Sequence, residues 1–297
     1  MVLNVEHVYR KGIGNINEDA YVLLEDEGIF SAIDGATGLG GLSGSIAAEI
    51  LREAIAGGTG QLVERVIKGN DKLREEAVSA FNKEQSFEDI PKHMRSSCGL
   101  AAVKINQVSE RVQLLDYVTA GDCILFVQYV DGRIRQVNID HIDPLDGIAI
   151  KMLTSYWIER FGEENPNALK EEEVFLIHKE FREKICEVLK INRNKLNTVE
   201  GYGIIDGSKE AEWFLEKGTI PLINVKKILL LSDGMKIHSP RKNPLSNEWL
   251  HTAEIAFAHG LEYLEKMVLD MENSDPACYD YPRLKKHDDK TGILVEL

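Results

Sequence analysis

Short stretches in the first part of the chain alternate apolar and polar residues, a pattern typical of strands. Residues 21–24 and 28–33 show this alternation and are flanked by turn residues. From Gly44 onward the apolar residues recur at helical spacing, and a second amphipathic stretch covers residues 62–81. The pattern therefore predicts a β-hairpin followed by two helices.

The middle of the chain contains several β-like runs in quick succession, and the dipeptide Asp131-Gly132 is a hairpin-turn signal before the last of them. The runs cover residues 98–105, 112–120, 123–130 and 133–137. We predict that they form a meander of three or four antiparallel strands.

The stretch from about residue 143 to residue 220 is richer in charge than its surroundings. It contains a turn signal at residues 163–167 and a polar amphipathic helix over residues 172–189. Charged runs of this kind are typical of a solvated helix face. We predict that this stretch is a variable cap, inserted into a single domain that spans residues 1–297.

The C-terminal third returns to apolar elements. Residues 226–231 end in a continuous apolar run that is too short for a helix and stops at Asp233-Gly234, which indicates a buried strand. Residues 247–272 predict one helix. The tail, residues 287–297, predicts a final strand that is entered through an acidic turn.

Composition limits the function classes. The 297 residues are 43% hydrophobic and 28% charged, enough to bury one large core, although two small domains stay possible. The formal net charge of -14 and the pI near 5.1 argue against a nucleic-acid surface, because such a surface needs clustered Lys and Arg. Bound metal ions could neutralise part of this negative charge.

The spacing of the cysteines and the length of the apolar runs favour a cytoplasmic location. Cys98, Cys123, Cys186 and Cys278 are far apart and form no C-x-x-C pair, which favours reduced thiols. The N-terminal segment has no apolar signal region, and no stretch approaches the ~20 apolar residues of a membrane span. We predict a cytoplasmic protein without a membrane partner.

Acidic turn residues recur where the β-like runs begin or end. They are Asn17-Glu18-Asp19, Asp34-Gly35, Asp233-Gly234 and Asp288-Asp289. Strand ends can converge, and hard cations such as Mg²⁺ and Mn²⁺ prefer oxygen ligands, so these residues could build a two-ion site. One Asp-Gly pair alone is better explained as a turn, because both residues favour turns. The order of all four turns favours the metal site.

Seven short motifs stand in a fixed order along nearly the whole chain. They are Gly14-x-x-Asn17-Glu18-Asp19-Ala20, Asp34-Gly35-Ala36-Thr37-Gly38, Ser97-Cys98-Gly99, Ala120-Gly121-Asp122-Cys123, Asp140-His141, Leu231-Ser232-Asp233-Gly234 and Asp288-Asp289-x-Thr291. No single motif is specific, but the set resembles the metal-dependent protein phosphatase 2C (PPM-type) family, in particular its bacterial members.

The resemblance implies an α+β fold: a two-sheet antiparallel β-sandwich flanked by α-helices, in four layers αββα. It also implies two Mn²⁺ or Mg²⁺ ions at one end of the sandwich. Asp34 would bridge both ions, and Asp233 and Asp288 would complete the shell of one. The carbonyl of Gly35 and, through water, Glu18 would serve the other ion.

The resemblance implies less central roles for two further acids. Asp19 would orient a metal-bound water from outside the ligand shell. Asp122 can help to hold a third ion in the family, but here Cys123 follows it and Ile237, which cannot ligate, stands where the family has a further Asp. A third site stays open, and the alternative for Asp122 is a turn cap.

The substrate side departs from the family pattern. Gly14 stands where the family commonly has an Arg that grips the substrate phosphate. Arg10 or Lys11 could reach in from the preceding strand, although a solvated strand edge explains them equally well. Ala36 replaces the His that eukaryotic members often use as the leaving-group acid, and bacterial members commonly lack that His too.

The leading hypothesis is a phosphatase that hydrolyses phosphoserine or phosphothreonine in proteins. Two close cations would lower the pKa of a bridging water and offset charge on the phosphoryl oxygens. One alternative is a weakly active or inactive phosphopeptide-binding regulatory module of the same fold. Another is a hydrolase of small-molecule phosphate esters, which the acidic chain would repel at long range.

Overall fold

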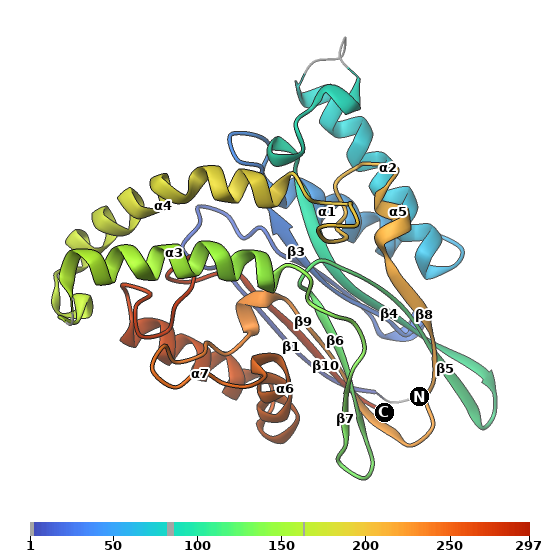
Figure 1. The fold of residues 1–297 in the computed structure, drawn as a ribbon. Helices are drawn as coiled ribbons and strands as arrows, with labels where there is room; N and C mark the ends of the chain where they lie inside the picture. Colours follow the sequence, from blue (N-terminus) through green and yellow to red (C-terminus); the bar gives the residue numbers. More distant parts are fainter. Residues whose placement is uncertain (1–2, 82–85, 163) are drawn as a thin grey trace.

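Two five-stranded antiparallel sheets pack face to face in the computed structural model, which describes residues 3–81, 86–162 and 164–297 (Figure 1). The first sheet has the order β1 (Asn4–Arg10), β10 (Lys290–Glu296), β9 (Val225–Leu231), β6 (Ile124–Tyr129), β7 (Ile134–Gln136). The second has the order β2 (Ala20–Leu24), β3 (Ile29–Ala36), β4 (Ser97–Ser109), β5 (Val112–Ala120), β8 (Glu216–Pro221). The predicted two-sheet sandwich is confirmed.

The alternation of side chains along each strand divides the core into layers. On β9, Ile228 and Leu230 face the second sheet, whereas Leu229 and Leu231 face the helices outside. All four side chains are fully buried. The apolar run at residues 228–231 is therefore continuous because both faces of this strand are covered.

Helices cover the outer face of each sheet. The second sheet is covered by α1 (Gly44–Gly57) and α2 (Leu62–Phe81), and the first by α6 (Glu248–His259) and α7 (Leu261–Ser274). This is the four-layer αββα arrangement that the resemblance implied. Short 3₁₀ helices occur at η1 (Glu25–Glu27), η2 (Phe87–Asp89), η3 (Lys92–Met94), η4 (Pro166–Ala168) and η5 (Asp233–Met235).

The single helix predicted for residues 247–272 is two helices, so that prediction was wrong. The break between α6 and α7 is at Gly260, whose φ of 85° favours glycine strongly. Glu6 of β1 accepts a hydrogen bond from the backbone N–H of Leu261 (3.1 Å), which ties the start of the second helix to the sheet.

The predicted meander was also wrong in one respect, because its strands belong to two sheets. β4 and β5 form a hairpin in the second sheet, while β6 and β7 pair in the first. The chain crosses between the sheets at residues 121–123, where Gly121 has a φ of 70°. The crossover leaves Asp122 at one end of the sandwich.

The charged stretch from residue 143 forms two long helices before it rejoins the sandwich. They are α3 (Asp143–Phe161), which was not predicted, and α4 (Glu171–Arg193), which matches the predicted helix at residues 172–189. The two helices lie side by side at one end of the molecule (Figure 1) and pack edge to face through Trp157 and Phe181 (centroids 5.1 Å apart).

After the short helix α5 (Ala211–Phe214), the chain enters β8 at Glu216, so the stretch predicted as a cap ends slightly before residue 220. The turn predicted at residues 163–167 overlaps the start of η4, while residue 163 lies outside the described residues. Among the described helices, none combines the length and the apolar character that a membrane span requires.

The N-terminus of α1 approaches the end of β3 closely. A Cβ atom on Gly44 would lie 2.3 Å from the backbone N of Ala36 and 2.4 Å from the carbonyl carbon of Gly35. Only hydrogen atoms at Gly44 allow this approach, which brings the helix beside Asp34.

We predict that Gly44→Ala lowers the free energy of unfolding by about 1–3 kcal/mol, because the methyl group overpacks two backbone segments. Gly57→Ala, at the other end of the same helix, is the matched control. A Cβ there meets nothing within 4 Å, so its effect should be neutral or stabilising by up to about 1 kcal/mol. Urea unfolding of both variants measures the difference, and equal stabilities would contradict the close approach.

Candidate metal centre

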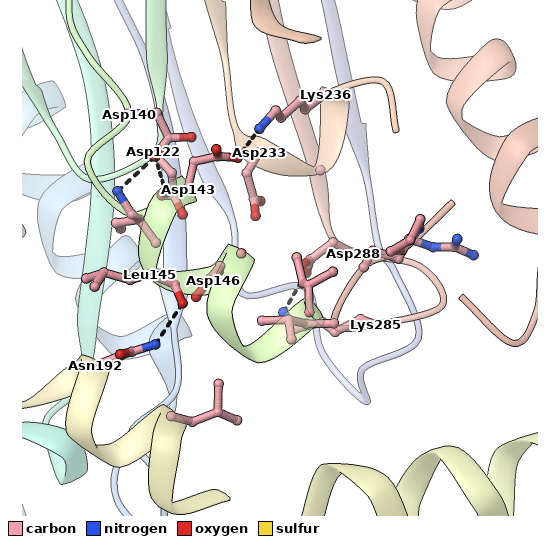
Figure 2. Close-up of a pocket in the computed structure, with 18 of the residues that line it drawn as sticks. Asp122, Asp140, Asp143, Leu145, Asp146, Asn192, Asp233, Lys236, Lys285 and Asp288 are labelled. Atoms are coloured by element: carbon pink, nitrogen blue, oxygen red, sulfur yellow. Dashed lines mark hydrogen bonds and ion pairs between the residues drawn. The ribbon is translucent and has the colours of Figure 1, made fainter. Parts of the chain in front are cut away.

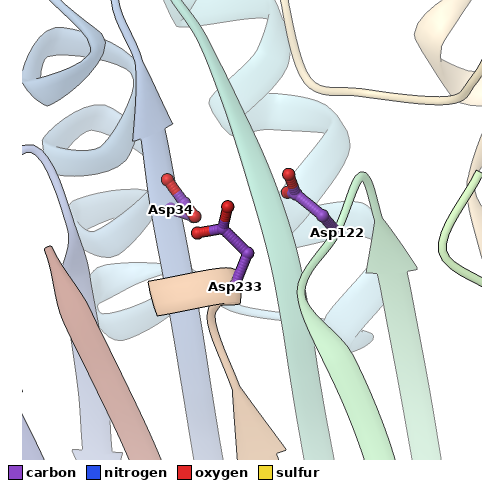
Figure 3. A group of neighbouring side chains, drawn as sticks. All are labelled: Asp34, Asp122 and Asp233. Carbon is purple, nitrogen blue, oxygen red and sulfur yellow. The ribbon is translucent and has the colours of Figure 1, made fainter. Parts of the chain in front are cut away.

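Three aspartates converge at the end of the sandwich where the strands meet the crossover. Asp34 lies near the end of β3, Asp122 lies between β5 and β6, and Asp233 begins η5 directly after β9. One carboxylate oxygen of each lies within 4.8 Å of those of the other two (Figure 3). Residues that are far apart in the sequence thus form one oxygen-rich group. It includes two of the acids at the predicted strand ends, Asp34 and Asp233, together with Asp122.

Glycines make room for these carboxylates. Gly99 of β4 pairs with Asp34, and a Cβ on it would lie 2.9 Å from Oδ1 of Asp122. A Cβ on Gly234 would lie 1.8 Å from the carbonyl oxygen of Asp289. The glycines of the Ser-Cys-Gly and Ser-Asp-Gly motifs, Gly99 and Gly234, therefore allow neighbouring segments to pack closely around the acids.

The carboxylates repel one another. Desolvation, followed by the negative charges of neighbouring acids, raises the pKa of Asp34 and Asp122 well above the usual range, and the pKa of Asp233 is raised for the same reasons. No ion pair among the described residues involves any of the three. An all-oxygen donor set with surplus negative charge fits a hard divalent cation such as Mg²⁺ or Mn²⁺.

Asp288 lines the same cavity, just before β10, but has a different partner (Figure 2). Its Oδ1 accepts hydrogen bonds from Nζ of Lys285 (2.7 Å) and from the backbone N–H of Asp289 (3.0 Å). Desolvation lowers the pKa of Lys285, but the charges of Asp288 and Asp233 outweigh it and raise the pKa above its ordinary value.

Glu18 lies at the N-terminus of α1. Its Oε1 accepts hydrogen bonds from Oγ of Ser43 (2.6 Å), from the backbone N–H of Gly44 (3.0 Å) and from the hydroxyl of Thr37. A carboxylate at this position is favoured by the helix dipole. Glu18 and the predicted carbonyl donor Gly35 both line the cavity.

Asp19 is buried beneath the cavity instead of lining it. Its Oδ2 accepts hydrogen bonds from Oγ of Ser232 (3.0 Å) and Oγ1 of Thr291 (2.7 Å). Desolvation and nearby acids raise its pKa well above the usual range, although the Thr291 hydrogen bond opposes this. Through Ser232, Asp19 is one residue away from Asp233, a position suited to indirect support of a metal ligand.

Asp289, to which sequence reasoning assigned no role, fastens the N-terminal motif to β10. Its Oδ1 accepts a hydrogen bond from the backbone N–H of Gly12 (2.6 Å), and its Oδ2 accepts one from the backbone N–H of Glu18 (2.7 Å). The two adjacent acids of the last motif therefore have different roles. Asp288 faces the cavity, and Asp289 binds the backbone of the N-terminal segment at Gly12 and Glu18.

A second acidic group lies at the start of α3. Sequence reasoning placed Asp140 in a motif without a role of its own and missed Asp146. Oδ1 of Asp140 accepts hydrogen bonds from the N–H groups of Ile142 (3.0 Å) and Asp143 (2.9 Å), and its Oδ2 accepts one from Nε1 of Trp249 (2.9 Å). Asp146, in the first turn of α3, lines the cavity. Desolvation and the negative charge of Asp233 raise the pKa of Asp146 to about 7.

The cavity has a volume of about 880 Å³ and is roofed by the α3–α4 pair (Figure 2). Its floor is the acidic cluster, and its walls include the basic side chains of Lys151, Arg182 and Arg193. Acids at the floor and bases on the wall suit an anionic ligand bound beside cations.

The predicted phosphate-binding residues lie elsewhere. Arg10 forms an ion pair with Glu265 of α7, and Nζ of Lys11 donates to the carbonyl of Asn15 (3.4 Å). Neither side chain, nor Gly14, lines the cavity. Ile237, at the position of the missing third-ion ligand, lines it but is 1% exposed and packs in the core between the first sheet and α6.

A buried charge network lies behind Asp288. Glu272 of α7, 1% exposed, accepts hydrogen bonds from Nδ1 of His287 (2.7 Å) and Nζ of Lys290 (3.0 Å), and Nε2 of His238 lies 3.3 Å away. Desolvation opposes ionisation, but the histidines and Lys290 lower the pKa of Glu272 to about 2. Because Nζ of Lys290 also donates to the carbonyl of Asp288 (3.0 Å), the network fixes the backbone of a predicted ligand.

We predict that Glu272→Gln lowers the free energy of unfolding at pH 7 by about 3–5 kcal/mol, because Lys290 is left buried without its counter-charge. Glu262→Gln, on the exposed face of α7, is the control and should change it by less than about 0.5 kcal/mol. Urea unfolding measures both.

The same pair of proteins tests the pH dependence. The folded pKa of Glu272 lies below its ordinary value of 4.5, so its stabilisation is complete above pH 4.5. It is lost as the pH falls toward about 2. The difference between wild type and Glu272→Gln should therefore shrink across this window. A difference that is constant with pH would contradict the ionised network.

Solved structures that share this architecture include bacterial phosphatases. A bacterial serine phosphatase matches with a TM-score of 0.52 and 15% identity over 99% of this chain and 98% of that chain. The serine/threonine phosphatase Stp1 from Staphylococcus aureus matches with 0.53 and 15%, over 100% and 96%. The PPM Ser-Thr phosphatase MsPP from Mycobacterium smegmatis, in complex with cacodylate, matches with 0.51 and 16%, over 99% and 98%.

No family model matches the sequence, and no curated protein matches it. The resemblance drawn from the motifs is nevertheless confirmed at the level of the fold: the chain is PP2C-like, with the architecture of the bacterial PPM phosphatases along nearly its whole length. At about 15% identity, the likeness concerns the fold alone.

Proposed function

We propose that this protein is a metal-dependent phosphatase that hydrolyses phosphoserine or phosphothreonine in proteins. The observation that carries the proposal is the convergence of Asp34, Asp122 and Asp233 at the cavity floor, on a fold shared with Ser/Thr phosphatases. A bound cation would offset the repulsion among these carboxylates. Divalent cations held in this way can catalyse the hydrolysis of phosphate esters.

The resemblance assigns a ligand role to each acid, and the described positions of these acids around one cavity are compatible with it. Asp34, Asp233 and Asp288, with the carbonyl of Gly35, would hold two Mn²⁺ or Mg²⁺ ions, and Glu18 would act through water. When bound, such ions activate water as a nucleophile and offset charge on the phosphoryl oxygens.

The remaining tasks belong to the protein itself. Asp19 would hold Ser232 and Thr291 in place, and so fix the backbone on which Asp233 is presented. Asp122 would complete a third cation site or neutralise its neighbours through a shared proton. Asp146 lines the cavity, and its side chain has no hydrogen-bonded partner among the described residues, so its carboxyl group would face a bound ligand.

The cap formed by α3 and α4 would select the substrate. It roofs a cavity of about 880 Å³, which is larger than a phosphate group alone requires. A segment of polypeptide on either side of a phosphorylated residue could enter beneath the two helices.

A phosphopeptide-binding module without turnover is the second candidate. Two observations favour it: Gly14 cannot grip a phosphate, and Ile237 is buried in the core. Calorimetry combined with an activity assay separates the two functions, because the module would bind Mn²⁺ and phosphopeptide but release no phosphate.

We predict that Asp34→Asn lowers kcat on an aryl phosphate at least about 100-fold in the presence of Mn²⁺, since a central ligand is lost. Mn²⁺ affinity measured by calorimetry should fall in parallel. Asp131→Asn, in an exposed turn outside the cavity, is the control and should retain full activity. Wild-type activity in Asp34→Asn would contradict the proposed centre.

We predict a separate effect for the cap. Lys151→Ala, on the cavity side of α3, should lower kcat/KM on a phosphopeptide with acidic flanking residues about 2- to 5-fold, the size expected for one exposed charge. The value on a small aryl phosphate should not change. Lys179→Ala, exposed on α4 outside the cavity, is the matched control. An equal loss on both substrates would argue against substrate selection by the cap.

A further inference from the structure

The proposed phosphatase needs a cationic side chain for the phosphate. Gly14 stands where the resemblance puts an Arg. Of the two alternatives nearby in the sequence, Arg10 is paired with Glu265 of α7, and Nζ of Lys11 donates to the carbonyl of Asn15. Binding of a phosphate dianion beside acidic groups without a positive side chain would depend on the ions alone. A cation on the cavity wall within reach of the predicted ligands would supply the missing positive charge.

Lys285 is the cation in that position. Of all ion pairs formed by the described residues, the one between Nζ of Lys285 and Oδ1 of Asp288 (2.7 Å) is the one that involves a predicted ligand. The charge of Lys285 also acts on Asp233 and Asp34. Figure 2 shows its side chain beside Asp288 at the same cavity.

Among the described residues, the other basic groups on the cavity wall form no ion pair with a predicted ligand. Lys151, Arg182 and Arg193 lie on α3 and α4, and two basic groups closer in sequence to the predicted ligands are already engaged. Lys236 pairs with Asp143 and with Glu248 (3.1 Å), and Arg283 is buried with its guanidinium 3.0 Å from Asp275. Lys285, by contrast, has a side chain that is 46% exposed, so its ammonium can move without breaking a buried network.

We propose that Lys285 is the phosphate-binding residue of this site and exchanges partners: it pairs with Asp288 in the metal-free protein and with phosphoryl oxygens once Asp288 is engaged by an ion. This inference rests on the proposed function, since it names the group that binds the phosphoryl substrate. A Lys ammonium is a compact charge with three donors on a flexible stem, which suits such an exchange better than a fixed Arg fork does.

Two opposite effects follow from the exchange. Without phosphate, Lys285 competes with a cation for Asp288, so its removal should leave Mn²⁺ affinity unchanged or increase it. With Mn²⁺ bound, its removal should weaken phosphate binding. A residue that merely supported the shape of the site would weaken both.

The test uses the full chain with Lys285→Met, which keeps the length of the stem and removes the charge. Calorimetry measures Mn²⁺ affinity, and then the affinity for inorganic phosphate at saturating Mn²⁺. We expect phosphate binding to weaken about 10- to 100-fold, the loss of one charge-assisted contact, with Mn²⁺ binding equal or tighter. Lys285→Arg should retain most of the phosphate affinity, and its thermal unfolding confirms that the loop is intact.

Lys286→Met is the matched control, because Lys286 is the adjacent residue but pairs with Glu171 and does not line the cavity. It should change neither affinity. Phosphate affinity within twofold of wild type in Lys285→Met, or a parallel loss of Mn²⁺ affinity, would overturn the assignment. If wild type binds phosphate through Lys285 but hydrolyses no ester, the proposed function fails while this assignment stands.

Discussion

Repulsion among carboxylates that the fold forces together is the constraint on which this structure depends. Asp34, Asp122 and Asp233 are presented from three connections at one end of the sandwich, in positions where desolvation makes ionisation costly. A loose scaffold would let them separate. Two sheets with a close-packed apolar interface and helices on both outer faces prevent that, so the cluster persists and favours a cation.

Much of this arrangement could be predicted from the sequence because the acids mark the strand ends. Most strands, the first two helices and the convergence of Asp34 with Asp233 follow from short apolar runs and the acidic turns where they stop. The two-sheet sandwich was implied by the resemblance that the seven motifs carry. The failures have local causes. Helix α3 has apolar residues on more than one side because it packs against α4 and also faces the cavity. At Gly260 and Gly121 a positive φ redirects the chain, and the hydrophobic pattern contains no signal for that.

The candidate site was harder to predict where contacts are long-range. Asp19 is hydrogen-bonded to Thr291, and Asp289 to Gly12, so both contacts join residues from nearly opposite ends of the sequence. A local sequence pattern cannot indicate such contacts, nor which of two adjacent acids faces the cavity. Arg10 was a plausible phosphate ligand in the sequence, yet its partner on α7 directs it outward. Lys285, the cation that pairs with Asp288 at the same cavity, belongs to a loop that carried no recognisable signal.

Activity of the wild-type protein on a phosphoserine peptide, measured as Mn²⁺ is titrated into metal-free enzyme, tests the central claim most directly. The account predicts no phosphate release in the presence of a chelator, a rate that rises to saturation with Mn²⁺, and a return to zero when chelator is added again. Saturable Mn²⁺ binding without phosphate release, or release that continues in the chelator, would contradict it.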